Sequence, residues 1–225
     1  PEYLQEREAL IPETKAGDSE ELAPDLFQSP APESPDTTHF NVVDADGMAV
    51  SFTYTLNFSY GSGFMAPGTG FLMNNEMDDF SAAPGVVNSW GLTGNAANAV
   101  APGKRPLHTI TPGMLSQDGR AVMSYGVMGG QYQPVGQAQV VTNVVDYAMD
   151  AQEAIDLPRS FWFEGVYQLE KGIPEDTRAA LEALGHTCGP IDPPHGGGQA
   201  IIIDWDTGTL EGGSDPRKDG IALGY

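Results

Sequence analysis

The stretch Thr37-Thr38-His39-Phe40-Asn41-Val42-Val43-Asp44 decides how this chain folds. Apolar and polar side chains alternate up to Asp44, the pair Asp46-Gly47 follows, and a second alternating run extends from Met48 to Thr55. Alternation with a period of two is typical of a β-strand, and an Asp-Gly pair between two such runs is typical of a tight turn. The sequence therefore predicts a β-hairpin whose first strand begins just after Thr37.

The residues before this hairpin have a different composition. Residues 1–11 are expected to be the end of a helix, whereas residues 12–36 are rich in proline and acidic side chains and predict an extended linker. If the chain were cut between Asp36 and Thr37, the threonine hydroxyl would gain an adjacent α-amino group, which is one way to activate this weak nucleophile. A Thr-Thr pair that enters a strand is usually only a β-former, so the pair alone does not establish catalysis.

Composition excludes several classes of function. The 225 residues carry a net charge of -21, which argues against binding to nucleic acid or to an anionic membrane surface. The single cysteine, Cys188, excludes an internal disulfide, and no apolar run is long enough for a membrane-spanning helix. The four histidines lack the spacing of metal ligands, so neither a metal nor another cofactor is expected: His39, His108, His186 and His195. Pro1 is not a natural start, so upstream sequence is expected.

The rest of the chain indicates an α+β fold. Strands are predicted at 107–112 and 121–127 around Asp118-Gly119, at 161–169, and at 199–205 and 208–212; helices are predicted at 134–149, 151–156 and 174–184. Residues 59–70 and 82–103 are expected to be loops. Strands, helices and strands follow one another without βαβ alternation, which favours layered antiparallel sheets.

Several motifs, in order along the chain, resemble the gamma-glutamyltranspeptidase family of N-terminal nucleophile hydrolases. The matching segments are Thr37-Thr38-His39-Phe40, Thr53-Tyr54-Thr55-Leu56-Asn57, Asn74 to Ser81, Lys104-Arg105-Pro106-Leu107, Gly129-Gly130, Ser214-Asp215-Pro216-Arg217 and Gly224-Tyr225. The resemblance implies a four-layer αββα sandwich completed by a large subunit from the same precursor. It also implies that residues 1–36 are the tail of that subunit and a linker, and that residues 37–225 are the small catalytic subunit, released by autocatalytic cleavage at Asp36-Thr37.

The resemblance assigns four residues to catalysis. Thr37 would be the nucleophile, and Thr55 would orient its hydroxyl from the partner strand of the hairpin. Gly129 and Gly130 would supply backbone N–H groups to an oxyanion hole, where glycine permits close approach. Without the resemblance, Thr55 would be read as a β-branched strand residue, and Gly129-Gly130 would be read as a turn.

A second group would bind the substrate. Asn57, Glu76 and Asp79 match positions that hold the substrate's α-amino group, for which carboxylates are suitable acceptors. His108 and Thr109 stand where many family members have two serines that help to bind the α-carboxylate. Trp90 falls where the family places an aromatic lid residue, although a tryptophan that anchors a surface loop is an equal alternative.

By this resemblance, the chain would transfer γ-glutamyl groups from glutathione-like amides to an amino acid, a peptide or water. His108, Met128 and Gln131-Tyr132-Gln133 depart from the common pattern and instead resemble cephalosporin or glutaryl acylases of the same family, which is the alternative. A non-catalytic assembly subunit is a third reading, and the intact Thr37, Thr55 and glycine pair count against it. A dimer of heterodimers and a bacterial source are also expected, while the compartment stays open between periplasmic or secreted and cytoplasmic.

Overall fold

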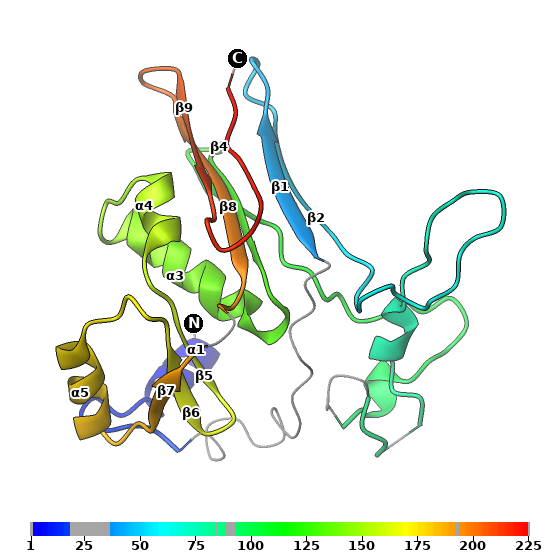
Figure 1. Ribbon diagram of the computed structural model, residues 1–225, viewed down its shortest axis with the longest axis horizontal. Helices are drawn as coiled ribbons and strands as arrows, with labels where there is room; N and C mark the ends of the chain where they lie inside the picture. The colour runs from blue at the N-terminus through cyan, green and yellow to red at the C-terminus, as the bar shows by residue number, and fades with distance from the viewer. Residues whose placement is uncertain (1, 19–36, 84, 89–92, 192–193, 225) are drawn as a thin grey trace. The chain divides into compact units, whose positions relative to one another are not determined.

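The computed structural model describes residues 2–18, 37–83, 85–88, 93–191 and 194–224 (Figure 1). These residues form two compact units that are built from alternating parts of the chain. Unit 1 takes its residues from Pro1–Ala31, Asp78–Arg105 and Ser160–Asp192, and unit 2 takes its residues from Pro32–Met77, Pro106–Arg159 and Pro193–Tyr225. The chain combines helices with largely antiparallel sheets, which confirms the predicted α+β class.

Unit 2 contains a two-stranded sheet, a four-stranded sheet and a set of helices. The two-stranded sheet is the hairpin β1 (Thr38–Val43) and β2 (Ala49–Tyr54). The four-stranded sheet has the order β3-β4-β8-β9, with β3 at Gly113–Gln117, β4 at Arg120–Met128, β8 at Gly197–Asp204 and β9 at Thr209–Ser214. The helical segments are η3 (Gly130–Tyr132), α3 (Gln133–Val145) and α4 (Ala151–Asp156).

The predicted hairpin at Thr37 is confirmed. Thr38 pairs with Tyr54 and Val43 pairs with Ala49, so the two strands are in register from end to end. The connecting loop is longer than a two-residue turn, because the Asp44 backbone N–H donates to the Met48 carbonyl at 3.1 Å. Gly47 supplies the left-handed conformation within this loop, with φ of +81°.

The hairpin packs on the four-stranded sheet through its polar face. The Asn41 amide donates to the Gln199 carbonyl at 3.0 Å and accepts from the Ser124 hydroxyl at 2.7 Å, while the Ser51 hydroxyl donates to the Tyr125 carbonyl at 2.8 Å. The opposite face is apolar and exposed, and consists of Phe40, Val42, Val50, Phe52 and Tyr54. Alternation therefore separates the two faces as predicted, and the polar one is covered.

His39 lies at the centre of this polar interface. Its ring is buried against Gly126, where an added Cβ would come within 2.3 Å of the imidazole. Nδ1 lies 2.6 Å from the Thr53 hydroxyl and Nε2 lies 3.2 Å from Oδ1 of Asn41. Because the Asn41 amide nitrogen already donates to Gln199, its oxygen faces His39, so the neutral ring carries its proton on Nε2 and accepts on Nδ1.

Helices α3 and α4 cover the other face of the four-stranded sheet, as Figure 1 shows. Pro134 lies in the first turn of α3, and Asp150 and Glu153 form a capping box on α4, so both helices begin close to the predicted residues 134 and 151. Unit 2 thus has three layers, which are the hairpin, the sheet and the helices. These correspond to three layers of the αββα arrangement.

Two predicted strands are wrong. Residues 107–112 form no strand, and β3 begins only at Gly113. The carbonyls of Thr109 and Thr111 instead accept hydrogen bonds from side chains of α3, which replaces the pairing that a neighbouring strand would supply. The single strand predicted at 161–169 is a hairpin, because Glu164 and Gly165 both adopt positive φ and reverse the chain.

Unit 1 combines a three-stranded sheet with short helices. Its strands are β5 (Ser160–Phe163), β6 (Val166–Leu169) and β7 (Cys188–Pro190), and its helical segments are α1 (Glu2–Glu8), η2 (Ala96–Asn98) and α5 (Glu175–Ala183). The 3-10 helix η1 (Glu76–Asp79) contributes residues to both units. Strand β7 was not predicted from the sequence, and it pairs in parallel with β6. In the described part of the chain, no helix has the length and apolar character needed to span a membrane.

The burial of His39 predicts a pH-dependent stability. Burial lowers the pKa of His39, and this effect outweighs the hydrogen bond to Asn41, which raises it. As pH falls through about 6.5, the unfolded chain takes up a proton that the folded chain resists, so the stabilisation present at higher pH is lost. As pH falls, the free energy of unfolding of the unsubstituted protein should decrease by up to about 1.4 kcal/mol per pH unit more than that of His39→Gln.

Urea unfolding between about pH 8 and about pH 5 checks this expectation. His108→Gln is the matched control, because the His108 side chain is exposed. Identical pH slopes in the unsubstituted protein and in His39→Gln would contradict the assignment of this dependence to His39.

Candidate active site

The structure brings the two predicted catalytic threonines together. Thr37 immediately precedes β1 and Thr55 immediately follows β2, so the hairpin register places them opposite each other. Oγ1 of Thr37 donates a hydrogen bond to Oγ1 of Thr55 at 2.9 Å. The Thr55 oxygen also accepts from the Asn57 backbone N–H at 2.9 Å, which fixes its position at the strand end. Both threonine side chains are half-buried.

Contacts between the hairpin and β4 indicate which part of the sheet lies nearest Thr37. Asn41 contacts Ser124, and His39, two residues earlier on β1, packs against Gly126, two residues later on β4. Strands β1 and β4 therefore run in opposite directions where they pack against each other. Continuing the pattern by one further step places Thr37 at the level of the end of β4, where Gly129 follows.

The glycine pair forms a tight turn between β4 and the helices. Gly129 has φ of +131° and Gly130 has φ of +53°, both in the region that favours glycine. The Gly129 carbonyl accepts from the Tyr132 backbone N–H at 3.0 Å. Because C=O and N–H point in opposite directions across a trans peptide, this bond directs the Gly130 N–H away from the helix. An N–H held in this way is suited to an anionic oxygen.

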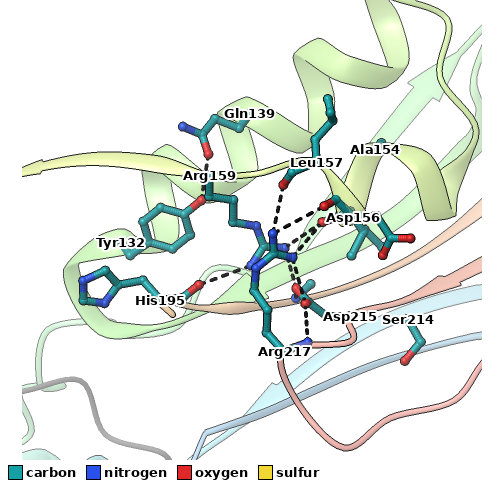
Figure 2. Close-up of polar contacts among 12 residues, drawn as sticks. Tyr132, Gln139, Ala154, Asp156, Leu157, Arg159, His195, Ser214, Asp215 and Arg217 are labelled. Atoms are coloured by element: carbon teal, nitrogen blue, oxygen red, sulfur yellow. Dashed lines mark hydrogen bonds and ion pairs between the residues drawn. The ribbon is translucent and has the colours of Figure 1, made fainter. Parts of the chain in front are cut away.

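Figure 2 shows a buried cluster of charges beside Tyr132, the residue whose backbone N–H donates to the Gly129 carbonyl. Asp215 is 1% exposed and forms ion pairs with both Arg159 and Arg217. The Arg159 guanidinium also stacks over the Tyr132 ring, with its central carbon 5.9 Å from the ring centre. Since Tyr132 holds the Gly129 carbonyl, the cluster joins the C-terminal segment to the glycine turn.

The same cluster ties α4 to the sheet. Arg217 donates to the carbonyls of Ile155 at 3.0 Å and Leu157 at 2.9 Å, at the C-terminal end of that helix. The Gly198 backbone N–H of β8 donates to the Asp215 carboxylate at 2.7 Å. A charge this deeply buried is stabilised only when it is paired and hydrogen-bonded, and these contacts meet that need.

Asn57 and Glu76, two of the predicted binding residues, are joined by Asn75. The Asn75 backbone N–H donates to the Leu56 carbonyl at 3.1 Å, and its side-chain oxygen accepts from the Phe58 backbone N–H at 3.0 Å. Asn75 therefore holds the loop that carries Glu76 against the segment that carries Asn57. Asn57 itself is buried and adopts φ of +77°, a conformation that asparagine tolerates better than most residues.

Thr109 belongs to this group, because its hydroxyl donates to the Glu76 carboxylate. His108 is exposed beside it. Asp79 is completely buried in unit 1, where its backbone carbonyl accepts from the Asn98 side chain at 2.7 Å. The predicted residues Asp36 and Trp90 lie outside the described residues.

Sequence reasoning missed the supporting residues. The sequence assigns no role to Arg159 and identifies Tyr132 only as part of a segment that departs from the common pattern. Asn75 and Asp215 appear there only within matching motifs. A buried aspartate between two arginines has no local signature, because its partners are far apart in the chain. Among the residues that the structure describes, no three His, Cys, Asp or Glu side chains gather as they would around a metal ion.

Comparison with known proteins identifies a matching family model and similar proteins of known name. The family model described as Gamma-glutamyltranspeptidase matches residues 1–225. The chain is 43% identical over 215 residues to the glutathione hydrolase proenzyme of Escherichia coli (strain K12), a match that covers 94% of this chain and 36% of that protein. The chain spans about two fifths of the length of the curated relatives it matches first.

Two solved structures are similar to the whole or most of the chain. Gamma-glutamyltranspeptidase from Pseudomonas nitroreducens complexed with L-DON has a TM-score of 0.73 and 37% identity, covering 84% of this chain and 99% of that one. The cephalosporin acylase from Bacillus halodurans has a TM-score of 0.78 and 34% identity, covering 100% of this chain and 39% of that one. Since the family model matches the full length, this chain belongs to the gamma-glutamyltranspeptidase family.

Proposed function

We propose that this chain is the small-subunit half of an enzyme that transfers or hydrolyses γ-glutamyl groups through a threonine ester. The observation that carries the proposal is the 2.9 Å hydrogen bond from Thr37 to Thr55, at the junction between the preceding segment and β1. Residues 37–225 would be the catalytic subunit, and residues 1–36 would end the large subunit. Cleavage of the Asp36–Thr37 bond would leave Thr37 with a free α-amino group.

The reaction proceeds in two acyl transfers. The α-amine of Thr37, with an ordinary pKa of about 7.7–8.0, takes the proton from Oγ1 as the oxygen attacks the amide carbonyl. The resulting oxyanion accepts hydrogen bonds from the N–H groups of the Gly129-Gly130 turn. The intermediate then expels the amine, which receives the proton, and leaves an ester on Thr37. Water or an amino acid's amine attacks this ester, releases the acyl group and restores the hydroxyl.

Substrate recognition would use the acidic and amide groups near Asn75. Glu76, oriented by the Thr109 hydroxyl, and Asn57 offer acceptors to an ammonium group, and Asp79 adds a second carboxylate by its match to the family motif. Recognition of a positive charge by two carboxylates suits the α-amino group of a γ-glutamyl substrate. Glutathione-like amides are therefore the first choice of substrate.

The exposed hairpin face supports a large-subunit partner. Phe40, Phe52 and Tyr54 form a ring cluster with centres 5.1 to 6.4 Å apart, and each is more than 40% exposed. A contiguous apolar face of this kind is typical of an interface. The relatives are proenzymes of which this chain spans about two fifths, so the remaining part of the precursor is the proposed occupant. It would supply the fourth layer of the sandwich.

An acylase that acts on cephalosporin-like or glutaryl amides is the second candidate. His108 stands exposed beside Thr109, at a position where the family commonly has a small hydroxyl residue. Histidine is bulkier and binds a carboxylate only as a donor or a cation. The similarity to the Bacillus halodurans cephalosporin acylase, with a TM-score of 0.78, favours the same alternative.

Substitution of the proposed nucleophile tests the mechanistic class. Thr37→Ala should abolish both self-cleavage and turnover, because one hydroxyl begins both reactions. Thr37→Ser should retain part of each, and Thr38→Ala, which changes the exposed neighbour, should retain both. Intact mass of the recombinant precursor measures cleavage, and a γ-glutamyl anilide measures turnover. A Thr37→Ala precursor that still splits before residue 37 would show that the nucleophile is another group.

Asp79 tests recognition of the substrate amine. Asp79→Asn keeps the shape of this buried side chain but removes its charge, so we expect about 1.5–3 kcal/mol of lost binding to an ammonium. The Michaelis constant for a γ-glutamyl anilide should rise roughly ten- to a hundredfold. A glutaryl anilide, which lacks the amine, and the exposed-neighbour variant Asp78→Asn are the controls. Equal losses on both substrates would mean that Asp79 supports structure only.

His108 tests the choice between the two candidate functions. Histidine is bulkier than serine and can donate a ring N–H to a carboxylate. His108→Ser should shift the ratio of kcat/KM values towards the γ-glutamyl anilide over the glutaryl anilide. Measurement of both substrates with both forms of the protein decides the matter. A ratio that stays the same in the serine variant would exclude His108 from the pocket.

A further inference from the structure

Gln133, a departure from the common family pattern, is a buried amide that joins two parts of the candidate site. It is the first residue of α3 and is 6% exposed. Its Nε2 donates to the Gly130 carbonyl at 3.0 Å and to the Thr109 carbonyl at 2.9 Å. Its Oε1 accepts from the Thr111 hydroxyl at 3.2 Å. Both amide hydrogens and the amide oxygen are therefore in use.

The two carbonyls belong to segments with different proposed tasks. Gly130 is part of the turn that would stabilise the oxyanion, and its carbonyl also accepts the Gln133 backbone N–H. Thr109 orients the Glu76 carboxylate, which would bind the substrate amine. No strand pairing holds residues 107–112 in place, so the Gln133 amide is a direct link between this segment and the glycine turn.

We propose that Gln133 is a positioning residue that sets the distance between the oxyanion turn and the segment that recognises the substrate. This inference rests on the proposed function. Gly129 and Gly130 have wide conformational freedom, so external hydrogen bonds must hold their peptide planes in the geometry that an oxyanion needs. Only an amide can donate to two carbonyls and accept from a hydroxyl at once, since a carboxylate has no hydrogen to donate and a methionine has no N–H.

The first test removes the donor while keeping the size of the side chain. Gln133→Met in the full precursor should lower kcat per cleaved chain by at least about tenfold, because misplacement of an oxyanion donor acts on the transition state. KM should change less than kcat, since the Thr109 segment keeps its contacts with Glu76 and Gln137, whereas the Gly130 carbonyl loses its side-chain donor. Gln137→Met is the matched control, because the Gln137 amide also donates from α3 to this segment, but at the Thr111 carbonyl rather than at the carbonyls of Thr109 and Gly130.

The second test uses pH. In Gln133→Glu the ionised carboxylate would face two carbonyl oxygens, whereas the protonated acid can donate to one of them. Burial and these oxygens raise the pKa of the introduced carboxyl group. The activity of this variant relative to the unsubstituted protein should therefore be higher at about pH 5.5 than at about pH 8.5. A purely structural role predicts no such recovery when activity is expressed per folded and cleaved chain.

The outcomes separate this inference from the proposed function. Absence of turnover in the unsubstituted precursor overturns the proposed function, and this inference with it. Turnover in which Gln133→Met behaves as Gln137→Met does, or in which the relative activity of Gln133→Glu is independent of pH, overturns this inference alone. If Gln133→Met stays uncleaved, Gln133→Glu precursor purified at high pH should begin to cleave on acidification, and failure to respond counts against the proposal.

Discussion

Hydrogen bonds between the polar face of the β1–β2 hairpin and the four-stranded sheet are the constraint on which the candidate site depends. A two-stranded hairpin is only marginally stable alone, so its position is set by what it packs against. Asn41 must meet both Ser124 and Gln199, and His39 must lie over Gly126. A slip of one residue would turn the apolar face inward and leave these groups unpaired, at about 1–3 kcal/mol for each.

This constraint aligns the two layers that would form the candidate site. The threonine pair belongs to the hairpin, whereas the glycine turn belongs to the end of β4. Specific polar contacts define one register, while an apolar interface tolerates several. The chain therefore places its polar groups where register matters and leaves its apolar ring cluster at Phe40 and Phe52 facing outward. In this arrangement the apolar face is available for association and the polar face for alignment.

Local signals predicted most elements correctly, because their causes are local. Asp118-Gly119 marks the turn between β3 and β4, and Asp150 caps α4. Alternation in the hairpin separated its faces but could not tell which one is covered, since that depends on distant strands. The hydrogen bonds of the Gln133 side chain to Gly130 and Thr109 were not predictable for the same reason, and neither were the ion pairs of Asp215. Each joins segments that are distant in sequence and carries no motif that can be read in one window.

The buried Asp215 cluster would also affect the timing of the proposed cleavage. Thr37 and Thr55 precede Asp215 and Arg217 in the chain, and the β1–β2 hairpin aligns them. Asp215 and Arg217, which anchor α4 and support the glycine turn through Arg159 and Tyr132, leave the ribosome much later. Domains fold as units once their segments are available. Under the proposed function, a nascent chain that ends before Asp215 would lack this support of the glycine turn, so cleavage before Thr37 would follow translation of the C-terminal segment.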